Sequence, residues 1–97
     1  MLNFKTETEE ILDKKFSDTI IDQWLFIKDS ETVKGTGPID WDLVKKTLPF
    51  ENEFEYDEGF GADDITGFIT FKNKDSWLMR YEHDGSSWWK YITRPSF

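Results

Sequence analysis

The chain has 97 residues and carries 20 acidic and 12 basic side chains, which gives a formal net charge of −8 at pH 7. This charge disfavours nucleic acids and anionic membrane surfaces as direct partners, because both attract lysine and arginine rather than carboxylates. The chain contains no cysteine, so disulfide bonds and cysteine-ligated zinc sites are excluded.

No segment approaches the roughly 20 apolar residues of a transmembrane helix, and the N-terminal residues form no apolar run of the kind found in signal peptides. We therefore expect a cytoplasmic protein, located in the host cytoplasm if the protein is viral. Aromatic residues make up 18% of the chain. Because each large ring buries roughly 150–250 Å², this content predicts a folded chain, and its length predicts a single domain over residues 1–97.

Residues 1–49 are predicted to be mainly helical. Thr6 or Thr8 can cap a first helix, with acidic residues in its first turn. Apolar residues then recur at three- and four-residue intervals, at Ile11, Leu12, Phe16, Ile20, Trp24 and Ile27. This pattern predicts one bent helix or two helices, although the apolar run 24–27 can alternatively start a strand.

A loop and a short helix follow in the predicted order. The glycine and proline content of residues 34–38 indicates the loop. A short helix is predicted from Trp41 to Leu48, with Asp40 as its N-terminal cap and Pro49 ending it.

Residues 50–97 are predicted to form an antiparallel sheet. Asp84-Gly85 is typical of a two-residue type I′ hairpin turn. Such a turn places Tyr81 opposite Trp88 and Arg80 opposite Trp89. With the helices before it, this sheet predicts an α+β fold in which N-terminal helices pack on one face of a three- or four-stranded antiparallel β-meander.

The preceding turn, at residues 73–75, fits a loop of either two or three residues. The three-residue loop pairs Phe71 with Trp77 and Ile69 with Met79, and we prefer it because it joins apolar residues. The core face of the sheet then carries Ile65, Ile69, Phe71, Trp77, Met79, Tyr81, Trp88 and Ile92. The other face carries Phe68, Thr70, Lys72, Leu78, Arg80, Glu82, Trp89 and Tyr91, with Arg80 at cation–π distance from its aromatic neighbours.

The segment ENEFEYDEGFGADD, residues 51–64, contains many carboxylates and no basic residue. In an extended strand its alternating acidic residues lie on one face, about 6.5 Å apart, and its aromatic residues lie on the other. A row of carboxylates at that spacing is comparable with the charges of a nucleic-acid backbone. The structural alternative is an edge strand that charge protects from aggregation.

Catalytic and metal chemistry have little support in the sequence. Residues 57–64 lack the spacing of an EF-hand loop, and an irregular calcium site there remains an alternative. The glycine pairs at 35–37 and 59–61 match no phosphate-binding motif and predict turns. His83 is the only histidine and lies beside Asp84 at a predicted hairpin tip, where catalysis is disfavoured. We expect no enzymatic activity, no metal and no cofactor.

A group of short elements is concentrated in the C-terminal half of the chain: Gly59-Phe60-Gly61, Ser76-Trp77-Leu78, Arg80, Asp84-Gly85 and Trp88-Trp89. In these elements the chain resembles small acidic proteins of bacteriophage and prophage type. The resemblance implies an accessory factor that binds and blocks host machinery, such as restriction or CRISPR effectors. Those effectors present basic nucleic-acid grooves, which suit an acidic ligand.

The leading functional hypothesis is therefore a non-enzymatic, acidic protein-binding inhibitor, a phage anti-defence factor of the anti-CRISPR or anti-restriction kind that mimics nucleic acid in a basic protein groove. Its expected contact residues are Glu51, Glu53, Glu55, Asp57, Glu58, Phe60, Asp63 and Asp64. The alternative is a structural or interaction module that uses an aromatic sheet face and can self-associate as a homodimer. Its expected contact residues are Phe68, Arg80, Trp89 and Tyr91. A small-molecule-binding or calcium-binding domain is a third hypothesis.

Overall fold

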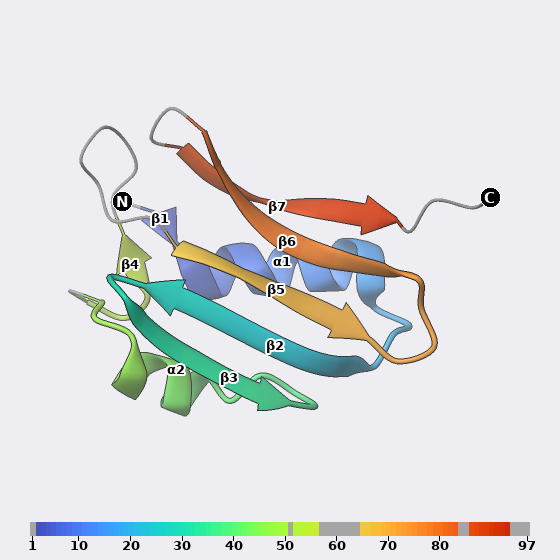
Figure 1. The fold of residues 1–97 in the computed structure, drawn as a ribbon, viewed down its shortest axis with the longest axis horizontal. Coiled ribbons are helices and arrows are strands. Elements are labelled where there is room, and N and C mark those ends of the chain that lie inside the picture. Colours follow the sequence, from blue (N-terminus) through green and yellow to red (C-terminus); the bar gives the residue numbers. More distant parts are fainter. Residues whose placement is uncertain (1, 51, 57–64, 84–85, 94–97) are drawn as a thin grey trace.

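A five-stranded antiparallel sheet with the order β3-β2-β5-β6-β7 forms the centre of the computed structural model (Figure 1). The structure describes residues 2–50, 52–56, 65–83 and 86–93. The elements are β1 (Leu2–Asn3), α1 (Phe4–Phe16), β2 (Ile21–Lys28), β3 (Glu31–Thr36), α2 (Trp41–Thr47), β4 (Glu55–Tyr56), β5 (Ile65–Phe71), β6 (Ser76–His83) and β7 (Ser86–Thr93). Strands β1 and β4 form a separate sheet of two strands.

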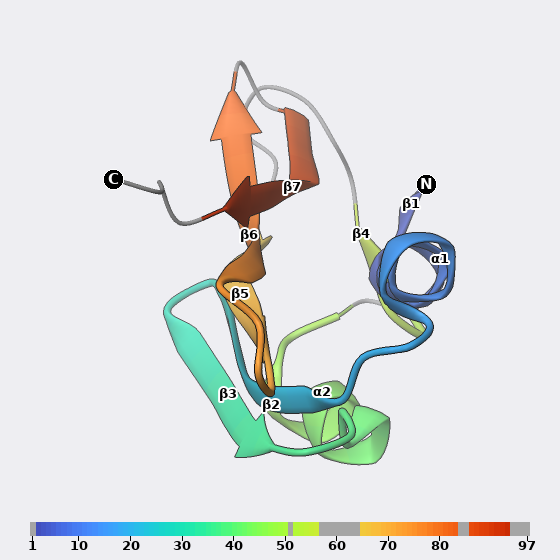
Figure 2. The same cartoon turned by 90° about the vertical axis from the view of Figure 1, so that its right-hand side faces the viewer.

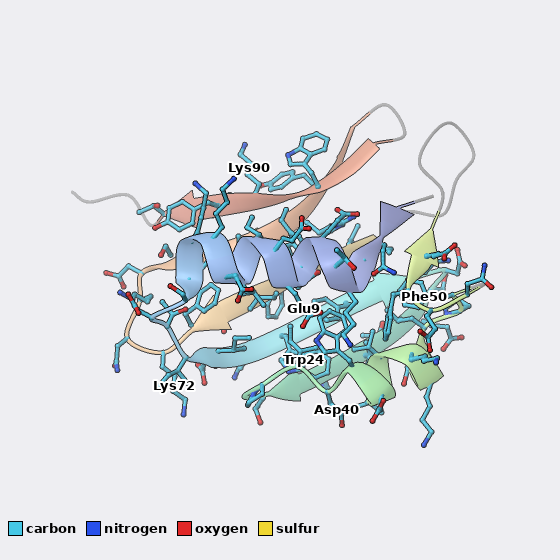
Figure 3. All side chains as sticks on the ribbon, turned by 180° about the vertical axis from the view of Figure 1, so that it is seen from behind. Glu9, Trp24, Asp40, Phe50, Lys72 and Lys90 are labelled. Atoms are coloured by element: carbon cyan, nitrogen blue, oxygen red, sulfur yellow. The ribbon has the colours of Figure 1, made fainter. Side chains whose placement is uncertain are left out.

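Both helices lie against the same face of the large sheet, which we call the helical side (Figure 2). Figure 3 looks onto this side and shows α1 crossing in front of the sheet. The predicted α+β class is confirmed. The predicted meander is present as β5-β6-β7, and the β2–β3 hairpin extends it to five strands.

Helix α1 begins earlier than predicted because Asn3, rather than Thr6 or Thr8, caps it. The Asn3 side-chain oxygen accepts a hydrogen bond from the Thr6 backbone N–H at 2.9 Å, which satisfies one of the unpaired donors of the first turn. Thr8 is instead buried. Its hydroxyl donates to the Phe4 carbonyl at 2.7 Å and accepts from the Trp89 indole N–H at 2.9 Å.

The helical prediction is wrong beyond Phe16, and residues 21–36 form the β2–β3 hairpin. The alternative, a strand containing residues 24–27, is confirmed. Strand β2 pairs with β3 on one side and with β5 on the other. Its residues alternate between the buried helical side and a half-buried opposite face. Its turn uses Asp29 and Ser30, both with positive φ as a type I′ turn requires. Neither is glycine, so the sequence signal for this hairpin is weak.

Strand β3 continues to Thr36, so the predicted loop at 34–38 is too long and Gly35 is a strand residue. Helix α2 is confirmed to within one residue. The Asp40 carboxylate accepts from the Leu43 backbone N–H at 3.1 Å, and the helix ends before Pro49.

The pairing of β6 with β7 is confirmed, because Tyr81 lies opposite Trp88 and Arg80 opposite Trp89. The turn itself, at residues 84–85, lies outside the described residues. This local prediction succeeds because the length of a hairpin loop fixes the register of the strands that it joins.

The predicted pairing of β5 with β6 is wrong by one residue. Ile69 lies opposite Leu78 rather than Met79, and Thr70 lies opposite Trp77. A slip of one residue exchanges the two faces of every strand beyond it. The core face of β6 and β7 therefore carries Leu78, Arg80 and Trp89, which are buried. The residues of these two strands that were predicted to face the core lie on the opposite face: Trp77, Met79, Tyr81, Trp88 and Ile92.

Candidate functional site

The face of the large sheet opposite the helices is the main candidate surface, and we call it the open face. The strand register places these residues on it: Gln23, Leu25, Ile27, Thr32, Lys34, Thr36, Thr66, Phe68, Thr70, Trp77, Met79, Tyr81, Trp88, Lys90 and Ile92. Figure 2 shows both helices on the other side, and within the described part of the chain no helix covers this face.

The open face is apolar at its centre and partly exposed. Tyr81 and Trp88 form a cross-strand pair, and 39% and 43% of their respective surfaces are exposed. The Lys90 ammonium lies 5.1 Å from the centre of the Tyr81 ring, at a cation–π distance. Large exposed aromatic residues on a contiguous apolar surface are typical of a binding site rather than of a solvated sheet.

A depression of about 440 Å³ lies at the end of the open face that is away from Tyr81 and Trp88. It lies between β2, β3 and β5, and the open-face residues that line it include Leu25, Lys34 and Phe68. Its volume lies within the range of roughly 300–1,000 Å³ that ligand-sized pockets occupy. The depression can therefore accept a side chain from a bound partner.

The charge of the open face differs from that of the whole chain. Its strand residues include Lys34 and Lys90 but no aspartate or glutamate, although the net charge of the protein is −8. Exposed carboxylates lie elsewhere, for example at Glu9 and Glu10 of α1 and at Asp42 of α2. The open face is therefore apolar and weakly basic, and the exposed carboxylates named above, all within the described ranges, lie away from it.

The four aromatic-interface residues of the sequence hypothesis do not share a surface. Phe68 is on the open face, whereas Arg80, Trp89 and Tyr91 are on the helical side. Arg80 and Trp89 are buried near α1, where Arg80 Nη1 forms an ion pair with Glu7 at 3.2 Å. The predicted cation–π contact between Arg80 and Trp89 exists, at 5.5 Å, but it lies inside the core. The one-residue register slip explains this misplacement.

Of the predicted acidic contact residues, the structure describes Glu53 and Glu55. The others, Glu51, Asp57, Glu58, Phe60, Asp63 and Asp64, lie outside the described residues. The Glu53 carboxylate is exposed and forms an ion pair with Lys45 at 2.7 Å. The hydrogen bond and the charge of Lys45 lower the pKa of Glu53 below its usual value.

The described part of the acidic segment is not a continuous strand of the large sheet. Strand β4 consists of two residues and pairs with β1, and Phe54 before it has a positive φ of 60°. The Phe54 ring is buried against Trp41 and Phe50, with ring centres 5.4 and 5.5 Å away. This aromatic residue of the acidic segment therefore belongs to the core.

Metal and membrane sites have no counterpart in the described residues. These residues contain no grouping of three or more histidine, aspartate or glutamate side chains able to hold a metal ion. The calcium alternative at residues 57–64 and the side chain of His83 lie outside them. Neither helix in the described ranges is long and apolar enough to cross a membrane.

Sequence reasoning placed Phe68 correctly but missed most of the open face, including Leu25 beside it and the exposed position of Trp88. The available signal was the short apolar run at residues 24–27, which fits a strand, although the three- and four-residue spacing of apolar residues favoured a helix. When the chain is compared with protein-family models, curated proteins and solved structures, nothing matches.

Proposed function

We propose that this protein is a non-enzymatic interaction module that binds an apolar, acidic surface of another protein through its open face. The observation that carries the proposal is an apolar face that no helix of the described residues covers, with Tyr81 and Trp88 exposed at one end and the depression beside Phe68 at the other. Aromatic residues dominate binding energy at interfaces, particularly where neighbouring groups exclude water.

The size of the open face suits a protein interface. Strands of about eight residues, rising about 3.3 Å each, in a sheet of five strands spaced about 4.8 Å apart, give a face of roughly 600 Å². Each partner in a standard protein–protein interface contributes about 800 Å². The open face and its rim together therefore approach the area that a specific complex needs.

Charge complementarity favours an acidic partner over a second copy of the chain. Lys34 and Lys90 lie on the open face, which carries no carboxylate on its strands. Packing two copies face to face would bring like charges into one desolvated interface, and such a juxtaposition costs several kcal/mol. An apolar surface bordered by aspartate or glutamate would instead pair with both lysines.

The test compares three forms of the protein in pull-downs from the source organism or its host, followed by affinity measurements with each purified captured protein. The forms are the wild type, the double variant Tyr81→Ser/Trp88→Ser, and Ile20→Ser as a matched control. Ile20 is 64% exposed but lies outside the open face. We expect the double variant to bind about 30-fold more weakly or worse, because it removes two exposed aromatic contacts, and the control to bind as the wild type does.

Two results would overturn this proposal. One is a captured partner whose affinity the double variant leaves unchanged. The other is self-association in sedimentation experiments that Tyr81→Ser/Trp88→Ser abolishes, because the occupant would then be a second copy.

The charge-reversed variant Lys34→Glu/Lys90→Glu should also weaken binding, and stronger binding would contradict the acidic partner.

We also propose, as a second function, an acidic inhibitor that occupies a basic groove of a nucleic-acid-binding protein, such as a phage anti-defence factor. The position of the described acidic groups supports it, because the exposed carboxylates of α1 and Glu53 lie outside the open face. Reversing Glu53, Glu55 and Asp57 together should abolish binding to such a basic partner and its salt dependence. Unchanged affinity and salt dependence would reject this second function.

A further inference from the structure

A second depression, of about 340 Å³, lies on the helical side, where the end of α1 meets the sheet. Its lining residues come from α1, the segment between α1 and β2, the β5–β6 turn, β6 and β7: Lys15, Phe16, Thr19, Lys74, Ser76 and Tyr91. We call it the α1-end pocket. It shares no lining residue with the open face.

The α1-end pocket combines cationic, hydroxyl and aromatic groups. Lys15 and Lys74 supply ammonium groups, and the described residues that line the pocket include no aspartate or glutamate. The ring of Phe16 lies 5.5 Å from that of Tyr91 and 4.3 Å from that of Phe71, so the pocket has an aromatic wall anchored in the core. This combination suits a ligand with an anionic head and an apolar body.

The Tyr91 hydroxyl is at the centre of these polar groups. Hydrogen bonds from Ser76 and Thr93 lower the pKa of Tyr91, and the positive charges of Lys74 and Lys15 lower it further. Both ammonium groups therefore lie within electrostatic range of the same phenol oxygen. An oxyanion in this pocket would be attracted by both lysines, which line it together with Tyr91.

The end of a helix normally disfavours anions, because its unpaired carbonyl groups carry partial negative charge. Here the Phe16 carbonyl already accepts two hydrogen bonds from Thr19, from the backbone N–H at 3.0 Å and from the hydroxyl at 2.5 Å. These bonds satisfy one of the unpaired carbonyl groups at the helix end. The lining ammonium groups of Lys15 and Lys74 oppose the partial negative charge of the others.

We infer that the α1-end pocket binds a small organic anion, with a phosphate group held by Lys15, Lys74 and the Tyr91 hydroxyl, and an apolar or aromatic body lying against Phe16. The class of ligand is a monophosphate ester of a small planar group. The pocket volume admits a ligand of that size.

Phenyl phosphate is the probe, and its binding is followed by NMR titration of the full chain. We expect saturable shifts at Lys15, Ser76 and Tyr91 with a Kd on the order of 1 mM. Inorganic phosphate and phenol each lack one half of the ligand, so each should bind at least about fivefold more weakly. Binding that fails to saturate at about tenfold above the expected Kd would overturn the inference.

Matched lysine variants separate a built pocket from diffuse attraction. Lys74→Gln removes a lining ammonium, whereas Lys72→Gln removes an exposed lysine that does not line the pocket. We expect Lys74→Gln and Tyr91→Phe each to weaken phenyl phosphate about fivefold, and Lys72→Gln to change it less than about twofold. Equal losses in the two lysine variants would overturn the inference, because the attraction would then be non-specific. Unchanged spectra away from the pocket show that each variant remains folded.

Discussion

Replacing Gly67 by alanine should destabilise the fold by about 3 kcal/mol or more. Gly67 lies in the middle of β5 with a φ of 153°, a conformation that residues with a side chain rarely adopt. A Cβ atom added there would lie 2.1 Å from the Leu25 carbonyl oxygen and 3.0 Å from the Phe26 Cα. Both atoms belong to the backbone of the neighbouring central strand, so relief requires that β2 and β5 move apart. Urea unfolding of the variant measures the loss.

Gly37→Ala is the matched control for this prediction. Gly37 also has a positive φ, of 73°, but an added Cβ atom would meet no atom within 4 Å. Its replacement should therefore cost only the conformational penalty of about 1–2 kcal/mol. Equal losses of stability in the two variants would show that the close approach of β2 to β5 at Gly67 is not the cause.

The elements that were predictable from sequence are those that local chemistry determines. Asp40 and Pro49 bound α2 because a cap and a helix breaker act within one turn of the chain. Asp84-Gly85 predicted the register of β6 and β7, since a tight turn fixes the pairing of the strands beside it. Neither prediction required knowledge of distant residues.

The elements that were not predictable depend on contacts between distant segments. Pairing apolar residues across β5 and β6 favoured the wrong register, because it treated Arg80 as a surface residue. In the structure the Arg80 guanidinium lies buried among α1 and aromatic rings, 5.1 Å from the centre of Phe4 and 3.2 Å from Glu7. A buried cation with such partners is compatible with a core face, but its partners on α1 lie 73 or more positions away in the sequence.

The same limit applies to the candidate surface. Trp88 and Trp89 are adjacent, so one must face each side of the sheet, and the sequence does not reveal which. The hydrogen bond from Trp89 to Thr8 of α1, at 2.9 Å, identifies the buried one. Trp88 is consequently on the open face, and the surface that we propose for partner binding depends on this single choice of face.

Replacing Phe4 by alanine should reduce the free energy of unfolding by about 3–5 kcal/mol, the usual range for a fully buried phenylalanine. Phe4 has no exposed surface. Its ring centre lies 5.0 Å from Phe26, 6.0 Å from Trp41 and 5.9 Å from Trp89. It therefore joins α1 to strands and to α2 across the core, and its removal leaves a cavity bounded by all of them. Since domains of this size are stable by about 5–15 kcal/mol, thermal and urea unfolding should show a large loss.

Phe68→Ala is the control that separates the core from the open face. Phe68 is only half-buried and faces away from the helices, so its replacement should cost about 1 kcal/mol because less apolar area is lost from the folded state. We expect Phe4→Ala to impair folding, and Phe68→Ala to preserve the fold and weaken partner binding. A larger loss of stability in Phe68→Ala than in Phe4→Ala would mean that the faces are reversed and that the open face is instead the core.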